Sequence, residues 1–236
     1  MEQQLTVFDS REESTFYGSC IRRFLFTKPK IDSQIVECGS GDALPIIDAI
    51  QGTDFNGMVT SYEINQSAAD LATEHIAKSR LNDSYQVINE NFLKVGLSSS
   101  YDVLISDPPF LPSLSDEIID PYLRGGDNGN EFTLDLIKMG YQEMVLMIPS
   151  YTDPVKTLEV AREHGYDLLD FVIAPMKLTF YSKDPEVYSR LTYMRALDKA
   201  FFSDDYFLLA GVHFKKQNIT DESKWEVLHR LITTDL

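Results

Sequence analysis

The stretch IVECGSGDALPII, residues 35–47, joins a short apolar run to a glycine turn and then to a second apolar run. Gly39 and Gly41 permit a tight turn and allow a ligand to approach the backbone closely. Asp42 and Pro45 are residue types that begin helices, so the stretch predicts a strand, a turn and a helix. A lone glycine turn is weak evidence for a ligand, and a purely structural turn stays open at this point.

Strands and helices alternate along the rest of the chain, which indicates parallel βαβ units. Strands are expected at residues 34–38, 58–62, 85–89, 101–106, 144–148, 166–174 and 206–214. Helices are expected near residues 14–27, 42–52, 65–80, 131–142, 153–165, 184–197 and 225–232. We see no linker and expect residues 1–236 to form one doubly wound, Rossmann-like α/β domain. It would have a helical N-terminal segment, 1–30, and a helical insertion, 176–204, between the last two strands.

The bulk composition restricts the class of partner. The formal net charge is −16 over 236 residues, which repels phosphate backbones at long range. A local basic groove could still bind nucleic acid, but a basic protein or a cationic small molecule is attracted more easily. Cys20 and Cys38 lack metal-type spacing and the four histidines are scattered, so we expect free thiols and no metal site. Neither a signal peptide nor a membrane-length apolar run is visible, which favours a cytoplasmic location.

Acidic residues surround the glycine turn and continue after the second strand. Glu37 and Asp42 flank the glycines, where carboxylates suit a cationic ligand and oppose a pyrophosphate. Glu63 ends the second expected strand, about twenty residues beyond the glycines, where an acid can accept both hydroxyls of a ribose. A ligand with a ribose, a positive charge and no phosphate is indicated, and S-adenosylmethionine fits that description. A solvated strand end is the alternative for Glu63.

The stretch YDVLISDPPFLPS, residues 101–113, ends a strand in an acid, two prolines and an aromatic ring. The prolines remove backbone donors and leave the Asp107 carboxylate and the Pro108 carbonyl as acceptors. Acceptors without donors can hold the two hydrogens of an NH2 group, while Phe110 lies over a planar group or near a sulfonium. This predicts transfer of a methyl group to nitrogen by orientation and electrostatics, without a metal. An ordinary proline-rich turn is the alternative.

The order of ECGSG, YE, Asn91-Phe92 and DPPF resembles class I S-adenosylmethionine-dependent methyltransferases. The resemblance implies a mostly parallel, seven-stranded sheet with the last strand antiparallel. Within the class, DPPF looks like the (Asn/Asp/Ser)-Pro-Pro-aromatic motif of enzymes that methylate adenine N6, guanine N2 or glutamine N5.

Two further segments narrow the likeness. EESTFYGSCIRRFL, residues 12–25, and RGGDNGNEFTLDLI, residues 124–137, resemble short HemK-type glutamine methyltransferases. In that family the N-terminal segment closes over the cofactor, and the target is the glutamine of a Gly-Gly-Gln loop in peptide release factors. Where this sequence has Asp107 and Phe110, the family has Asn and Tyr. An Asp at the first position of the motif is more usual in adenine methyltransferases.

The family's functional residues can be placed on matching positions of this sequence. By this resemblance Thr15 would contact the cofactor, and Asn91 with Phe92 would lie by its adenine. The cofactor's backbone and ribose would be held by Gly39, Gly41 and Glu63. The target amide would be held by the segment from Asp107 to Phe110.

These motifs predict an S-adenosylmethionine-dependent methyltransferase acting on an amide or amino nitrogen, most simply a protein glutamine N5. A small-molecule amine or amide, a nucleic-acid adenine or guanine, and a non-catalytic binding protein of the same fold stay open as alternatives. The sequence leaves open a homodimer or an activating subunit. It leaves open whether the aromatic residues of 176–204 form a substrate lid or a subunit contact, although packing is the more usual role.

Overall fold

The computed structural model describes residues 10–27, 34–95, 101–217 and 222–234. The chain divides into two compact units, Met1–Asp107 and Pro108–Leu236. The boundary falls inside the D-P-P-F motif, between its acid and its first proline. The expectation of a single domain stays a prediction, and each unit is described by itself.

The first unit contains four strands in the order β3-β2-β1-β4, with each neighbouring pair parallel. Their bounds are β1 Gln34–Cys38, β2 Met58–Glu63, β3 Tyr85–Asn89 and β4 Val103–Ser106. In register, Cys38 is level with both Tyr62 and Ser106, and Glu63 is level with Asn89. The carboxyl ends of all four strands therefore meet at one edge, where ligands bind in α/β sheets of this kind.

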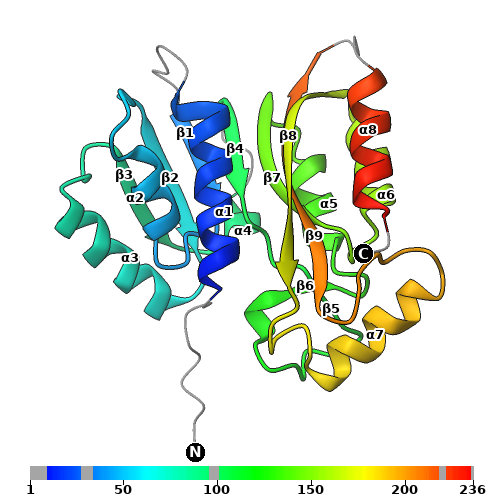
Figure 1. The fold of residues 1–236 in the computed structure, drawn as a ribbon. Coiled ribbons are helices and arrows are strands. Elements are labelled where there is room, and N and C mark those ends of the chain that lie inside the picture. Colours follow the sequence, from blue (N-terminus) through cyan, green and yellow to red (C-terminus); the bar gives the residue numbers. More distant parts are fainter. Residues whose placement is uncertain (1–9, 28–33, 96–100, 218–221, 235–236) are drawn as a thin grey trace, which may run out of the picture. The chain divides into compact units, whose positions relative to one another are not determined.

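Helices accompany these strands in the first unit (Figure 1). They are α1 Arg11–Ile21, its π-helical continuation Arg22–Phe26, α2 Leu44–Ile50, α3 Gln66–Ser79 and the short α4 Phe92–Val95. Asn65 caps α3 as expected, because its side chain accepts from the amides of Ser67 and Ala68. A side chain at Gly18 would collide with the Pro45 carbonyl, so glycine lets α1 pack closely on the first turn of α2. The expected end of the first helix at Lys28–Lys30 lies outside the described residues.

The second unit contains three long strands in the order β7-β9-β8, and β9 is antiparallel to both neighbours. The strands are β7 Glu143–Pro149, β8 Tyr166–Lys177 and β9 Tyr206–Lys216, and a small parallel pair is formed by β5 Leu111–Pro112 and β6 Arg124–Gly126. The helices are α5 Glu131–Lys138, α6 Pro154–Glu163, α7 Pro185–Arg195 and α8 Glu222–Ile232, with a 3-10 turn at Pro121–Leu123 (Figure 1).

Over the described residues, the four parallel strands of the first unit and the last strand, β9, which is antiparallel to β7 and β8, confirm the predicted α/β class and its antiparallel last strand. The insertion between β8 and β9 carries α7, at the place where a helix was expected. The helix predicted to reach residue 142 ends earlier because Gly140 adopts a φ of +81°. β8 and β9 run further than expected because they pair along their whole length. None of the helices in the described part has both the length and the apolar character needed to cross a membrane.

Candidate functional site

The glycine turn after β1 adopts the backbone conformation that its sequence predicts. Gly39 has a φ of +82° and Gly41 a φ of +51°, a region that favours glycine. A Cβ atom at either position would meet no heavy atom of the described residues within 4 Å. Backbone conformation rather than crowding therefore requires these glycines, and the side of the turn where a Cβ would stand is open to a ligand.

Glu63, the last residue of β2, lies beside this turn. One carboxylate oxygen, Oε2, accepts from the Gly41 amide at 3.0 Å, and the other, Oε1, accepts from the Asn65 amide at 2.8 Å. The side chain is buried, and burial raises its pKa although the backbone amides oppose that shift. The carboxylate thus joins the end of β2 to the glycine turn and to the start of α3. Its expected role toward a ribose stays a prediction.

Glu37 is directed into the interior of the first unit. Its two carboxylate oxygens accept from the Tyr17 hydroxyl at 2.9 Å and the Tyr85 hydroxyl at 2.5 Å. The residue is 1% exposed, and burial raises its pKa to about 7 against the lowering effect of these hydrogen bonds. The structure therefore gives Glu37 protein partners on α1 and β3. Contact between Glu37 and a cofactor stays a prediction.

Asp107 follows β4, and its Oδ1 atom is buried without a hydrogen-bond partner among the described residues. Burial raises the pKa of Asp107 well above its ordinary range, and the charges of Glu13 and Glu37 raise it further. Glu13 comes from α1 and is 4% exposed. Its Oε1 accepts from Ser10 at 2.8 Å, its Oε2 lacks a partner within the described part of the chain, and burial raises its pKa to about 7.

Three carboxyl groups from α1, β1 and β4 therefore interact electrostatically in the interior of the first unit. In the described residues none of them forms an ion pair. Such a group of acids is unfavourable when ionised and is stabilised by a positive charge. Glu13 was missed in the sequence because a second acid in a helix's first turn usually faces solvent. Its place in the EESTF segment was the available signal.

Asn91 and Phe92 lie at the start of α4. The Asn91 side chain accepts from the Leu93 amide at 3.0 Å, which turns the chain into the helix. Phe92 is buried, and its ring centroid lies 5.8 Å from that of Tyr62 on β2. Both residues follow the carboxyl end of β3. Their contact with an adenine stays a prediction.

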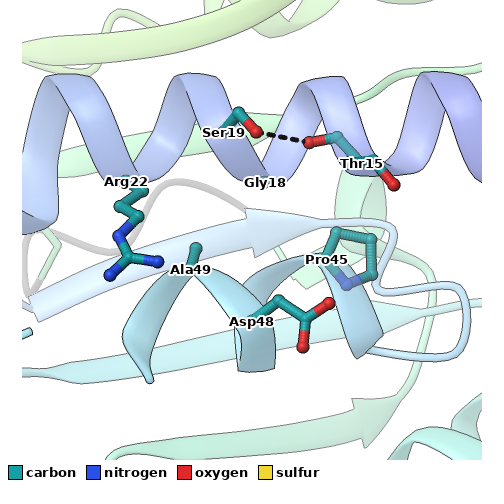
Figure 2. Close-up of a pocket in the computed structure, with 7 residues that line it drawn as sticks. All are labelled: Thr15, Gly18, Ser19, Arg22, Pro45, Asp48 and Ala49. Atoms are coloured by element: carbon teal, nitrogen blue, oxygen red, sulfur yellow. Dashed lines mark hydrogen bonds between the residues drawn. The ribbon is translucent and has the colours of Figure 1, made fainter. Parts of the chain in front are cut away.

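Thr15 is an exposed residue of α1. Figure 2 shows it with Gly18 and Ser19 on α1, across from Pro45 and Asp48 on α2, where these residues line a small pocket. The pocket volume is about 110 Å³, which is below the range of about 300–1,000 Å³ that is usual for sites that enclose a whole ligand. Contact between Thr15 and a cofactor stays a prediction.

Pro108 and Phe110 belong to the second unit. Phe110 is 8% exposed, and its ring meets the edge of Tyr151 at a centroid distance of 5.9 Å. A Cβ atom at Gly125 would stand 2.6 Å from the Pro109 carbonyl oxygen and 2.7 Å from the Phe110 Cα atom. The segment after Asp107 is therefore held by direct backbone packing.

No group of three or more His, Cys, Asp or Glu side chains among the described residues could hold a metal ion, and the expected absence of a metal site stays a prediction. Cys20 and Cys38 are both buried free thiols, as expected. Burial raises the pKa of Cys20 to about 12 and that of Cys38 further still, so neither thiol is activated as a nucleophile.

No family model matches this chain. Four relatives match parts of it, and two of them represent the two named activities. A tRNA1(Val) (adenine(37)-N6)-methyltransferase of Bacteroides thetaiotaomicron is 31% identical over 83 residues, 35% of each chain. A candidate protein N5-glutamine methyltransferase of Methanocaldococcus jannaschii is 31% identical over 105 residues, 42% of this chain and 50% of the relative. The chain thus spans about a third to a half of the length of these relatives.

Solved structures match nearly the whole chain. A candidate RNA methyltransferase from Pyrococcus horikoshii aligns with a TM-score of 0.57 at 12% identity, covering 89% of this chain and 87% of that one. The chain has the class I methyltransferase fold. A second methyltransferase, from Thiobacillus denitrificans in complex with S-adenosyl-L-homocysteine, aligns with a TM-score of 0.51 at 12% identity, covering 91% of this chain and 95% of that one. The likeness to class I methyltransferases expected from the motifs is confirmed.

Proposed function

We propose that this chain is an S-adenosylmethionine-dependent N-methyltransferase that acts on an amide or amino nitrogen. The observation that carries the proposal is the group of acids Glu13, Glu37 and Asp107 in the first unit, because Glu13 and Asp107 each have a buried oxygen without a hydrogen-bond partner in the described residues. Within the described part of the chain no positive side chain pairs with these acids, and a sulfonium with its amino-acid head would provide a positive charge. The names of the relatives and the fold of the solved neighbours support the same class.

The residues of the first unit fit this cofactor. Gly39 and Gly41 leave open space beside the turn, and Glu63 presents a carboxylate at the neighbouring strand end. Carboxylates there disfavour a dinucleotide, whose pyrophosphate is negative. By the resemblance, Asn91 would lie by the adenine and Thr15 would contact the cofactor. When bound, S-adenosylmethionine supplies a methyl group made electrophilic by its sulfonium.

The chain's own residues would orient the acceptor nitrogen. The Asp107 carboxylate and the Pro108 carbonyl would accept the two hydrogens of an NH2 group, which leaves the nitrogen lone pair free for in-line attack. Phe110 would lie against the planar part of the acceptor. Asp107 accepts hydrogen bonds most strongly in its ionised form. A nearby positive charge lowers the pKa of a carboxyl group, so the cationic cofactor would favour that form.

Protein glutamine N5 is the acceptor we propose first. The N-terminal segment 12–25 and the segment 124–137 both resemble glutamine methyltransferases, and the relative from Methanocaldococcus jannaschii is named for that activity. The net charge of −16 suits a basic protein better than a phosphate backbone.

Adenine N6 in RNA is the second candidate. Asp107 at the first position of the motif and the tRNA methyltransferase relatives both favour it. A small amine or amide is a third acceptor that would use the same chemistry.

The test is transfer of a radiolabelled methyl group from S-adenosylmethionine to three acceptors in parallel. These are a release factor with a Gly-Gly-Gln loop, unmodified transfer RNA, and free glutamine with adenosine. We expect labelled protein, and loss of label with Asp107→Ala while cofactor binding persists. Loss of binding together with turnover would mean that Asp107 serves the cofactor or the fold instead. Labelled RNA whose binding weakens steeply with salt would replace the glutamine assignment by the adenine one.

A further inference from the structure

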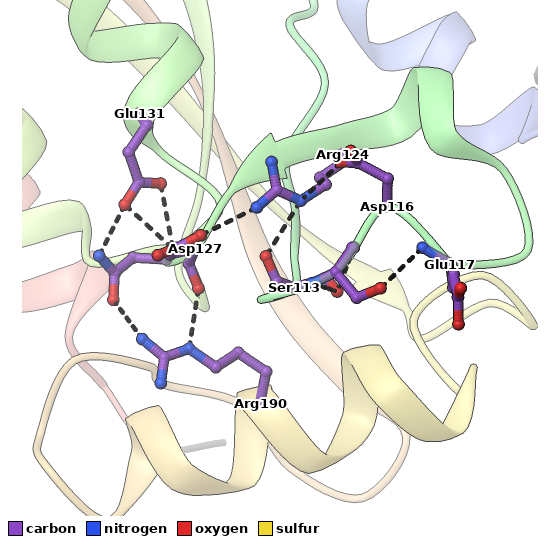
Figure 3. Close-up of polar contacts among 9 residues, drawn as sticks. Ser113, Asp116, Glu117, Arg124, Asp127, Glu131 and Arg190 are labelled. Carbon is purple, nitrogen blue, oxygen red and sulfur yellow. Dashed lines mark hydrogen bonds and ion pairs between the residues drawn. The ribbon is translucent and has the colours of Figure 1, made fainter.

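The helical insertion of the second unit is linked to the segment that follows the D-P-P-F motif. Arg190, on α7, donates from Nε to the Asp127 carbonyl at 2.8 Å and from Nη2 to the Asn128 side-chain oxygen at 3.0 Å (Figure 3). One guanidinium group therefore holds the main chain of one residue and the side chain of the next. A planar fork of donors makes this possible, and a lysine ammonium lacks that geometry.

The residues that Arg190 contacts, Asp127 and Asn128, belong to a segment that forms its own internal hydrogen bonds. Asn128 donates from its backbone and side-chain nitrogens to the Glu131 carboxylate, with the shortest bond at 2.7 Å. Arg124 donates from Nη2 to the Asp127 carboxylate at 2.8 Å and from Nε to the Ser113 carbonyl at 3.0 Å (Figure 3). The segment from 124 to 131, which runs from β6 to the first residue of α5 and is called the 124–131 turn below, is thus held together by hydrogen bonds, and Arg190 contacts it from α7.

This turn packs directly on the acceptor motif. A Cβ atom at Gly129 would stand 2.5 Å from the Phe110 carbonyl oxygen, and one at Gly125 would stand 2.6 Å from the Pro109 carbonyl oxygen. The glycines bring the two main chains together without an intervening side chain. A displacement of the turn would therefore move the backbone of the Pro-Pro-Phe part of the motif.

The insertion itself is firmly placed within the unit. The α7 side chains of Val187, Leu191 and Met194 are fully buried. Asp184 caps the helix, and its second carboxylate oxygen accepts from the Ile119 amide at 3.1 Å. The buried apolar face and the capped start of α7 fix the position of this helix in the unit. The hydrogen bonds of Arg190 therefore attach the turn to a firmly placed helix.

We propose that Arg190 is a positioning residue for the methyl acceptor. It fixes the turn at 124–131, and through it the Pro-Pro-Phe backbone against which the acceptor nitrogen is oriented. The inference rests on the proposed function for its catalytic consequence, while the link itself exists in the second unit alone. The proposal gives the insertion 176–204, which carries α7, a role in the reaction.

The link is tested by hydrogen exchange in the full chain, with Arg190→Ala, Arg190→Lys and the control Arg195→Ala. Arg195 lies on the same helix and stacks over Phe202 at 5.1 Å. We expect amide exchange in residues 124–131 to rise by about tenfold with Arg190→Ala, less with Arg190→Lys, and not with Arg195→Ala. Equal exchange in all three variants would overturn the inference.

The catalytic consequence is tested with the acceptor that the wild-type protein methylates. Arg190→Ala should lower kcat for that acceptor by about tenfold, with Arg190→Lys partly restoring it, because a misplaced acceptor reacts slowly. The affinity for S-adenosylmethionine should not change, since its proposed ligands lie in the first unit. Faster exchange with unchanged kcat would overturn the positioning role. A wild-type protein that binds no S-adenosylmethionine would overturn the proposed function, while the exchange data would still report the link.

Discussion

The buried carboxyl group of Glu13 should make the stability of the protein depend on pH. The side chain is 4% exposed, only its Oε1 atom has a hydrogen-bond partner in the described residues, and its pKa rises from 4.5 to about 7. The folded state then binds more protons than the unfolded state between these two values. Stability therefore falls as pH rises from about 4.5 to about 7 and stays low above that.

The magnitude follows from the size of that rise in pKa. A difference of 7 minus 4.5 is about 2.5, and each unit is worth about 1.4 kcal/mol, so ionised Glu13 lowers the free energy of unfolding by about 3 kcal/mol. Glu13→Gln keeps the shape and removes the charge. The variant should be about 3 kcal/mol more stable than the wild type at pH 8. The two should have nearly equal stability at pH 4.5.

The assay is urea unfolding at pH 4.5, 6 and 8, followed by far-ultraviolet circular dichroism. Fluorescence of the single tryptophan is unsuitable, because Trp225 lies in the second unit and Glu13 in the first. Glu12→Gln, on the exposed side of the same helix, is the comparison variant; it removes only a minor charge that raises the pKa of Glu13, so it should change the pH dependence of stability much less than Glu13→Gln. A Glu13→Gln variant whose stability relative to wild type is the same at all three values would refute the reasoning.

Three further predictions concern substitutions of single residues. Gly41→Ala should lower the free energy of unfolding by about 1 kcal/mol, because a φ of +51° is costly for alanine; equal stability in urea would contradict this. Glu63→Ala should weaken S-adenosylmethionine binding in calorimetry, and unchanged affinity would remove its ribose role. Burial alone would raise the pKa of Glu143, but hydrogen bonds from His213 and Lys215 outweigh it and lower the pKa to about 2. Glu143→Gln should therefore lose stability at pH 7, and the loss should shrink as pH falls from 4.5 toward 2; an undiminished difference at pH 2 would count against it.

Sequence patterns over a few neighbouring residues predicted most of the helices and strands. The glycine turn, the caps at Asn65 and Asp184, and the alternation of apolar runs place nearly every long strand and helix where the structure has them. The strand pair β5–β6 was missed because its strands have only two and three residues, too short for a periodic pattern.

The site was harder to predict, because its groups come together through tertiary contacts. Glu37 flanks the glycine turn in sequence, yet its carboxylate bonds to Tyr17 and Tyr85, twenty and 48 residues away. In a strand buried on both faces, no alternation of polar residues indicates which way a side chain points. The link from Arg190 to Asp127 spans 63 residues and leaves no mark in the local sequence.

Calorimetric titration with S-adenosylmethionine, with NAD as the control ligand, is the direct test of the proposed cofactor. We expect binding of S-adenosylmethionine alone, and weaker binding by Glu13→Gln, because the acids of the first unit are proposed to meet the positive charge of the cofactor. Failure of the wild-type protein to bind S-adenosylmethionine, or equal binding of NAD, would contradict this proposal.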